Sequence, residues 1–327
     1  MIDAKINQIA ISAADALKRQ PLVLNYKQEL GKLLIHHIGQ SVLFLITCTS
    51  VLSVLLIFYF IIKEAFPFLQ QFSLVEFFTS IGWYPQAQPP QFGALSLIAG
   101  SFYVTITAMI IAVPMGISAA VFLSDIVSFK IQSIVKPIIE LLAAIPSVAY
   151  GFFAVIVLAP WMQHHLGFST GVNALNASVI LAVMALPTII SVAQDSISAV
   201  GRELREASYG LGATRMETIF KVLIPAAHSG IIAAVILGMM RAIGETMVVW
   251  MASGNAAKIP SPWWDLTQSV RTMTATIAGD MGETAKGSEH YRALFAIGLF
   301  LLVLTLALNL LSEYFLSRTI KKTRVKK

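Results

Sequence analysis

The chain has 327 residues, of which 57% are hydrophobic and only 12% are charged, and its mean hydropathy is +0.76. Soluble domains carry about 25% charged residues, so the composition excludes an ordinary soluble protein. The formal net charge of +6 would suit a nucleic-acid-binding protein, but the basic residues are placed as in a membrane protein, so we expect no nucleic-acid partner. The single cysteine, Cys48, excludes a disulfide within the chain.

Six apolar segments are long enough to cross a lipid bilayer, which takes about 20 helical residues. We predict spans at residues 38–62, 94–123, 137–161, 175–193, 222–249 and 293–316. Pro114 and Gly116 predict a kink or a tilt in the second span. The predicted fold class is therefore an all-α membrane protein with six transmembrane helices. A polar tail, residues 1–37, precedes the transmembrane domain at 38–316, and a basic tail, residues 317–327, follows it.

Lysine and arginine predict the orientation of these spans, because short cytoplasmic loops carry an excess of both. They gather in the two tails, between the second and third spans, and in the loop at 195–221, whereas none occurs from Glu64 to Phe129. The longer loop at 254–291 carries a few, and long loops count less. We therefore expect a multi-pass membrane protein with both termini and the 195–221 loop in the cytoplasm, and with the 254–291 loop on the opposite side of the membrane.

The cytoplasmic loop has an ordered pattern of small and polar residues. Residues 202–209 suit a short helix, Gly210 and Gly212 end it, and the capping-box pattern Thr214-x-x-Glu217 starts another helix. The loop is therefore predicted to form a helix–turn–helix elbow, although a plain surface loop with solvated charges is the alternative interpretation. Small side chains at 207, 208, 210 and 212 would let another protein approach the backbone closely.

The spacing within this loop resembles the EAA loop of ABC importer permeases. The pattern is Glu206-Ala207-Ser208, three residues, Gly212, nine residues, and then Val-x-Ile-Pro225. Ser208 stands where the family pattern has a second alanine. The resemblance implies that ATPase subunits grip the loop and move the spans. The sequence contains no G-x-x-x-x-G-K-[ST] motif, so this chain is predicted to be a transporter subunit that leaves ATP hydrolysis to its partners, not an enzyme.

Arg241 and Glu245 are the two oppositely charged residues of the fifth predicted span. Their four-residue spacing predicts one helical face, and charged groups at membrane depth usually face a bundle interior or a wet cavity. The planar fork of an arginine suits an oxyanion such as phosphate, and Glu245 could hold Arg241 or balance its charge. An intrahelical ion pair near the outer interface, with Arg241 reaching toward water, is the alternative.

The sequence Arg241-Ala-Ile-Gly-Glu245-Thr-Met, following an EAA loop, is similar to the signature of the permeases of phosphate-specific ABC importers. Segments 91–102, 112–117, 122–125, 136–153 and 274–283 are similar as well, so the resemblance covers about residues 38–316. The Phe-Gly-Ala-Leu sequence at the start of the second span resembles the C-type chain. The resemblance implies the type I ABC importer permease fold, and it implies that Arg241 and Glu245 are needed for phosphate passage.

The same resemblance implies a location in the bacterial inner membrane, with the 254–291 loop in the periplasm. It also implies the partners: a homologous A-type permease chain, two ATP-binding ATPase subunits, and a phosphate-binding protein outside the membrane. It implies no cofactor. We also expect no metal site, because His164 and His165 have no further ligands spaced nearby.

Two further residues are candidates for a gate or for a structural role. Glu140 is either an interfacial carboxylate close to Lys136 or a contact at an inner gate, and Pro146 is expected to bend or end the third span.

Three other functions remain as alternatives. The chain could be an ABC permease for another oxyanion, such as sulfate, molybdate or phosphonate. It could be a secondary transporter or channel that needs no ATPase. An intramembrane enzyme has the least support, because neither an H-E-x-x-H motif nor a Ser–His or paired-carboxylate arrangement stands out at membrane depth.

Overall fold

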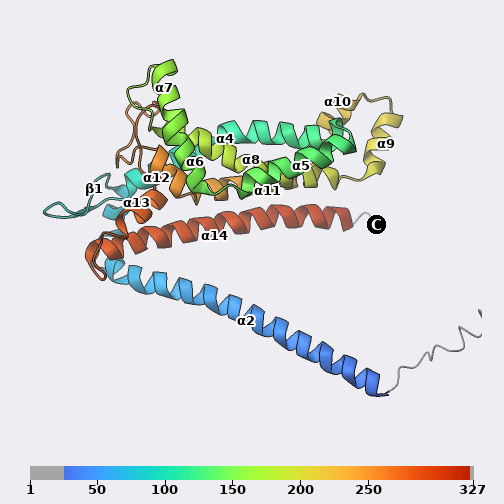
Figure 1. Cartoon of the computed structure of the whole chain (residues 1–327), viewed down its shortest axis with the longest axis horizontal. Helices are drawn as coiled ribbons and strands as arrows, with labels where there is room; N and C mark the ends of the chain where they lie inside the picture. Colours follow the sequence, from blue (N-terminus) through green and yellow to red (C-terminus); the bar gives the residue numbers. More distant parts are fainter. Residues whose placement is uncertain (1–25, 325–327) are drawn as a thin grey trace, which may run out of the picture. The chain divides into compact units, whose positions relative to one another are not determined.

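The computed structural model describes residues 26–324, which fall into two compact units that meet between Phe60 and Ile61. Helix α2 (Tyr26–Gln71) makes up the first unit and continues into the second (Figure 1). Residues 26–37 of the predicted polar tail are therefore helical, and the remainder of that tail lies outside the described residues. The basic tail is described as far as Arg324, where the last helix ends.

The second unit is helical apart from one short hairpin. Strands β1 (Trp83–Tyr84) and β2 (Gln91–Phe92) pair in antiparallel fashion. The α-helices after α2 are α3 (Leu74–Thr79), α4 (Leu95–Val121), α5 (Phe129–Ala144), α6 (Ser147–Phe153), α7 (Ala159–Leu166), α8 (Ala174–Ser198), α9 (Arg202–Gly210), α10 (Arg215–Thr218), α11 (Ile224–Ile243), α12 (Met247–Ala252), α13 (Met273–Asp280) and α14 (Glu289–Arg324). Single π-helical turns, η1 (Phe122–Ile126), η2 (Ala154–Leu158) and η3 (Ile219–Leu223), join neighbouring helices.

Among residues 26–324, six helical segments are long and apolar enough to cross a membrane, which confirms the predicted number. They are His36–Gln71, Leu95–Ile126, Ser147–Leu166, Ala174–Ser198, Arg215–Ile243 and Glu289–Phe315. Four agree with the predicted spans to within a turn or a few turns at their ends, whereas the third and the fifth differ in ways that matter for function.

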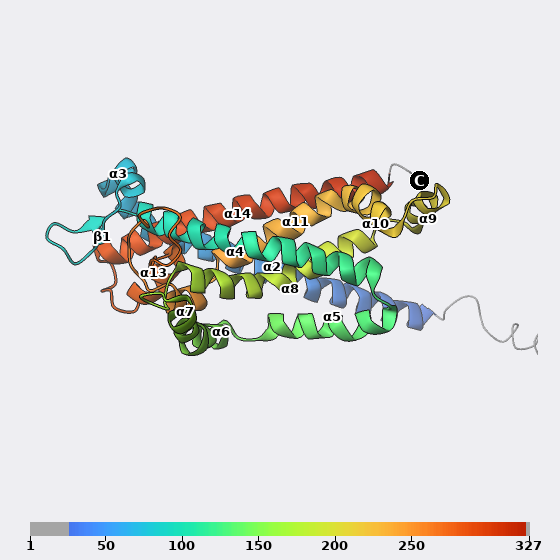
Figure 2. The ribbon, with the colours of Figure 1, turned by 90° about the horizontal axis from the view of Figure 1, so that it is seen from above.

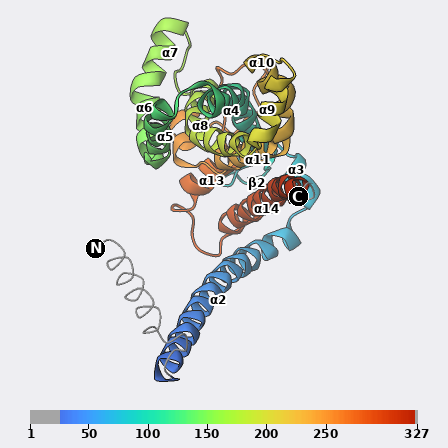
Figure 3. The ribbon, with the colours of Figure 1, turned by 90° about the vertical axis from the view of Figure 1, so that its right-hand side faces the viewer.

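The third predicted span, 137–161, is two helical segments with a break between them. Helix α5 ends at Ala144, and Ile145 and Pro146 are extended, with ψ angles of 129° and 136°. Pro146 has no N–H to continue the helix, and the residue before a proline avoids the α region, so the break follows from the sequence. Figures 1 and 3 show α6 and α7 running across the direction of α5.

The fifth predicted span, 222–249, is wrong at its far end. Helix α11 ends at Ile243, and α12 begins at Met247 after a turn at Gly244. Glu245 lies in that turn. The prediction that Arg241 and Glu245 share one face of a continuous helix is therefore wrong, because the helix ends between them.

Helices α4, α8, α11 and α14 form the centre of the unit, with α8 against both α4 and α11, and α14 against α11 (Figures 1 and 2). Glycines allow the close approach of α8. A Cβ at Gly116 of α4 or at Gly238 of α11 would lie 2.6 Å from a side-chain atom of the fully buried Ile189. Small residues at helix contacts are typical of membrane proteins, where close packing replaces the hydrophobic effect between helices.

The elbow and the hairpin lie at opposite ends of this bundle. Figure 2 shows α9, α10 and the C-terminal end of α14 at one end, and β1, α7 and α13 at the other. The segment at 195–221 and the end of α14 therefore share one side, which is the arrangement that the distribution of lysine and arginine predicts.

Candidate functional site

The predicted helix–turn–helix elbow is confirmed as α9, a turn, and α10. Both hydrogen bonds of the capping box form: Glu217 N donates to Thr214 Oγ1 at 3.3 Å, and Thr214 N donates to Glu217 Oε2 at 3.1 Å. Gly212 has a φ of +84°, which a residue with a Cβ adopts only with strain. The sequence signals for the elbow are local, and the capping box and the glycine turn both form as predicted.

The residues singled out in the EAA-like loop differ in exposure. Glu206, Ala207, Gly212 and Pro225 are exposed. Ser208 is buried, and its Oγ lies 2.8 Å from Oγ1 of Thr218, so it joins α9 to α10. The expectation that Ser208 offers its small side chain to a partner is therefore not met.

The elbow also exposes several large apolar side chains, which we call the apolar ridge. Leu211 at the turn is the most exposed of them, at 89%. The ridge consists of Leu204, Tyr209, Leu211, Met216 and Phe220. Exposed apolar patches beside polar residues are typical of protein-binding surfaces.

An ion pair fixes the elbow to the end of α4. Arg205 Nη1 lies 3.1 Å from Asp125 Oδ1, and the side chain of Asp125 is only 8% exposed. Arg205 Nη2 also donates to the carbonyl of Ile197 at 3.1 Å, and Ser124 Oγ donates to Asp125 Oδ2 at 2.6 Å. These contacts connect α9 to η1, directly after α4, and to the end of α8. Sequence reasoning did not pair these residues, because they lie far apart in the chain and no spacing rule connects them.

Arg241 lies in the last turn of α11, half-buried, facing the break between α5 and α6. Its Nη2 donates to the carbonyl of Ala143 at 3.5 Å, and its Nε is buried without a hydrogen-bond partner. Within residues 26–324, no ion pair joins Arg241 to Glu245. The guanidinium thus has spare donor capacity inside the bundle, and the alternative of an intrahelical ion pair is not what the structure shows.

Glu245 is held through its backbone. Its carbonyl accepts a hydrogen bond of 2.8 Å from Thr274 Oγ1 on α13, and its N–H donates to the carbonyl of Ala242 at 3.3 Å. The turn that carries Glu245 is therefore held against α13 at the hairpin end of the bundle. The side chain of Glu245 is half-buried.

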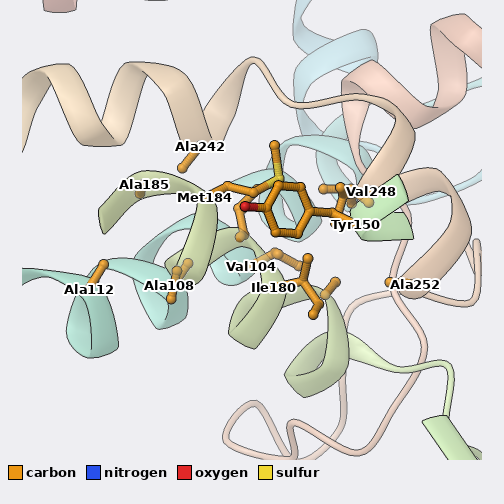
Figure 4. Packing of buried hydrophobic residues seen from close by; sticks show 14 of the residues in the cluster. Val104, Ala108, Ala112, Tyr150, Ile180, Met184, Ala185, Ala242, Val248 and Ala252 are labelled. Carbon is orange, nitrogen blue, oxygen red and sulfur yellow. The ribbon is translucent and has the colours of Figure 1, made fainter. Parts of the chain in front are cut away.

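Tyr150 is a residue that the sequence did not single out. It lies on α6 and is 9% exposed, and its hydroxyl donates to the carbonyl of Leu142 at 2.9 Å. Figure 4 shows its ring beside Met184 of α8 and Val248 of α12, within the main hydrophobic cluster. The only sequence signal for this role was its position four residues after the proline break.

Glu140 and Pro146 lie on either side of the end of α5. Pro146 forms the break, and Glu140 is exposed. Lys136 pairs with Asp195 of α8 at 3.2 Å instead of with Glu140. Whether Glu140 is an interfacial carboxylate close to Lys136 or a contact at an inner gate stays a prediction.

At the opposite end from the elbow, a pocket of about 390 Å³ lies between the hairpin and the segment around α13. Its lining includes Trp83, Tyr84, Arg271, Asp280, Glu283 and His290. Arg271 and Asp280 are ion-paired. Burial raises the pKa of Asp280, but the hydrogen bond from His290 and the charge of Arg271 lower it more, so that its pKa lies below the ordinary value.

Across the described part of the chain, no cluster of three His, Cys, Asp or Glu residues could hold a metal ion.

The comparisons with known proteins agree with this architecture. Residues 112–321 match the family model described as binding-protein-dependent transport system inner membrane component. The probable ABC transporter permease protein YqgH of Bacillus subtilis (strain 168) is 42% identical over 246 residues, which are 75% of this chain and 79% of the relative.

Several relatives carry the name phosphate transport system permease protein PstC, and two of them serve as examples. That of Mesorhizobium japonicum is 35% identical over 266 residues, which are 76% of this chain and 80% of the relative. That of Haemophilus influenzae is 32% identical over 247 residues, which are 70% of this chain and 77% of the relative.

Among solved structures, a chain of the MetNI methionine ABC transporter in an inward-facing conformation superposes with a TM-score of 0.50 and 19% identity. The match covers 69% of this chain and 94% of that chain, and it shows the fold alone. The six apolar helices, the matched family model and these relatives lead to one conclusion: the chain belongs to the family of binding-protein-dependent transport system inner membrane components and is a multi-pass membrane permease with the fold of the ABC importers.

Proposed function

We propose that the chain is the C-type permease subunit of an ATP-driven phosphate importer. It forms the translocation path together with a homologous A-type permease and takes up work from two ATPase subunits through the elbow. A phosphate-binding protein delivers the anion at the hairpin end. Both termini and the elbow lie in the cytoplasm of a bacterium, and the 254–291 loop lies outside the inner membrane.

The observation that carries the proposal is the state of Arg241. A guanidinium inside an apolar bundle is costly unless it is paired or serves a ligand. The one hydrogen bond formed by Arg241 is long, to an uncharged carbonyl, and its Nε has no partner. A guanidinium in this state is ready to form charge-assisted hydrogen bonds to an oxyanion. A single arginine also allows release, which a dense basic cluster would hinder.

The relatives named for phosphate transport support phosphate as the anion. The exposed apolar ridge and the Arg205–Asp125 ion pair support ATPase coupling through the elbow, because the ridge offers a surface for a partner and the ion pair leads from it into α4. A rigid push on the elbow would rock the helices between two states, as alternating access requires.

The test is uptake of labelled phosphate by the reconstituted complex, with binding protein and ATP present, when Arg241 is replaced. Arg241→Gln keeps a polar, though shorter, side chain but loses the charge and the fork. We expect uptake to fall about tenfold or more, because a hydrogen bond to a charged group contributes about 1.5–3 kcal/mol. Arg241→Lys is the matched variant that keeps the charge, and it should retain more uptake than Arg241→Gln.

Unchanged phosphate uptake by an assembled Arg241→Gln complex would remove the proposed role. Competition by unlabelled sulfate, molybdate and phosphonate separates phosphate from the other oxyanions. Uptake that continues without ATP and without ATPase subunits would identify a secondary transporter instead.

A further inference from the structure

Helix α5 buries little of its surface and has few polar fixings. None of the residues of α5 is buried. Near its middle, Lys136 pairs with Asp195 of α8 at 3.2 Å. At its C-terminal end, the chain breaks at Ile145 and Pro146, and the polar contacts of that end come from α6 and α11. An element with little buried surface and few fixings is suited to move as a unit.

The end of α5 needs hydrogen-bond donors that its own helix does not provide. The last four carbonyls of any α-helix lack an intrahelical donor. In a continuous helix, the N–H of the residue four positions later would donate to the carbonyl of Leu142. That residue is Pro146, which has no N–H. Tyr150 supplies the missing donor through its hydroxyl, at 2.9 Å. Arg241 supplies one to the next carbonyl, that of Ala143, at 3.5 Å. A tyrosine and the candidate anion-binding arginine therefore cap the same helix end.

These two contacts differ in strength and in mobility. The ring of Tyr150 is buried in the cluster formed by α4, α8 and α12 (Figure 4), so its hydroxyl is a fixed point. The contact of Arg241 lies at the outer limit of a hydrogen bond. Hydrogen bonds from a guanidinium to an oxyanion are shorter, at about 2.7–2.9 Å, and roughly twice as strong as neutral ones. An anion that reaches Arg241 therefore outcompetes the carbonyl of Ala143.

We propose that the end of α5 is the latch of the anion path: Arg241 caps Ala143 at rest and leaves it for the transported anion, and Tyr150 is the positioning residue that keeps the end of α5 within reach of Arg241. The latch rests on the proposed function, because it takes Arg241 as the group that meets the anion. The anion binds the free guanidinium better than the guanidinium that caps Ala143. Binding of the anion therefore shifts the equilibrium toward the state in which α5 is released. The anion thereby opens the path that it follows.

The first experiment measures passive efflux of labelled phosphate from proteoliposomes that contain the whole complex, without ATP. Tyr150→Phe removes the hydroxyl and keeps the ring. We expect efflux to rise about fivefold, because the net contribution of one hydrogen bond corresponds to that change in a two-state equilibrium. The apparent KM for ATP-driven uptake should fall, since Arg241 is free more often. The matched control is Tyr103→Phe, because Tyr103 lies on α4 against the same cluster and its buried hydroxyl has no hydrogen-bond partner in the structure.

The double variant Tyr150→Phe with Arg241→Gln separates a latch from a general loss of packing. A latch predicts that the extra efflux disappears, because the leak needs Arg241 to meet the anion. A packing defect predicts efflux that persists in the double variant and also appears in Tyr103→Phe, and either result would overturn the proposal.

A second measurement leaves Tyr150 in place. In a Cys48→Ser background, Ala143→Cys reports the state of the latch through its rate of labelling by a water-soluble maleimide. Saturating inorganic phosphate should raise that rate about fivefold, by the same two-state reasoning. A rate that does not change with phosphate contradicts the latch. If Arg241→Gln transports phosphate normally, the proposed function fails; if Arg241→Gln is inactive but Tyr150→Phe does not leak and the labelling rate is constant, only the latch fails.

Discussion

Asp280 accepts hydrogen bonds from residues of three different segments and so ties together the hairpin end of the bundle. Trp83 Nε1 lies 3.2 Å from Oδ2, His290 Nε2 lies 3.3 Å from the same oxygen, and Arg271 Nη2 donates to Oδ1. One carboxylate thus joins β1, the segment before α13, the end of α13 and the start of α14. No local pattern in the sequence indicates this arrangement.

Replacing this carboxylate should loosen the loop around α13. Asp280→Asn leaves Arg271 without its anion, and we expect backbone amides of residues 271–290 to exchange hydrogen roughly tenfold faster, since losing a hydrogen bond to a charged group costs about 1.5–3 kcal/mol. Hydrogen–deuterium exchange with mass spectrometry on the purified complex measures this. Glu283→Gln is the matched control, because Glu283 is an exposed carboxylate of the same pocket that forms no ion pair within the described residues.

The difference between wild type and Asp280→Asn should depend on pH. The pKa of Asp280 in the folded chain lies below its ordinary value, so the charged form contributes stability above the unfolded pKa of about 3.9. That contribution is lost as the pH falls through the lower pKa of the folded state. The exchange rates of wild type and Asp280→Asn are compared after correction for intrinsic rates. A larger difference between them at pH 3 than at pH 6 would contradict this account.

At the scale of whole elements, glycine conformation decides the shape of the elbow. The turn between α9 and α10 requires the positive φ of Gly212, whereas Gly210 ends α9 with an ordinary φ. A Cβ at either position meets no atom within 4 Å, so the two positions differ in backbone conformation and not in the space around them.

Gly212→Ala should therefore impair coupling where Gly210→Ala does not. We expect the left-handed conformation to cost about 1–2 kcal/mol with an alanine in place, which reshapes the turn that carries Leu211. The measurement is the ratio of ATP hydrolysed to phosphate transported, which should rise for Gly212→Ala and remain near the wild-type value for Gly210→Ala. Equal ratios for the two variants would show that the turn geometry does not carry the coupling.

Much of the element structure could be predicted from the sequence, and what was missed has physical reasons. Hydropathy located six long helices, and capping and glycine signals located the elbow. The end of α11 at Ile243 was missed because the apolar run resumes at Met247 after a short interruption, residues 244–246. The contacts of Arg241 and Arg205 were missed because each partner lies on another helix, and sequence spacing carries no information about such pairs.

At the scale of the whole molecule, the chain leaves its elbow open for a partner at one end of the bundle (Figure 2). Leu211, which is 89% exposed, is the most prominent side chain of the apolar ridge. An apolar side chain with so little contact to its own chain has no role in the stability of the free subunit, so a substitution there reports on assembly.

Leu211→Ser should weaken binding of the permease to the ATPase subunits. Burying a leucine contributes about 1.5–3 kcal/mol, so we expect the affinity between permease and ATPase to fall at least tenfold, measured by co-purification over a range of detergent and salt conditions. The control is Phe129→Ser, since Phe129 is 82% exposed but lies outside the elbow, at the start of α5. Equal retention of the ATPase subunits by both variants would place the docking surface elsewhere.

A helix without a buried side chain, such as α5, should tolerate many mutations in the isolated subunit. At the apolar positions of α5, one apolar residue should replace another without consequence for that subunit. Any intolerance that a saturation scan of the assembled importer finds at these positions must then originate in the neighbouring permease or in the lipid. Such a helix is thereby a direct reporter of what lies next to its subunit in the membrane.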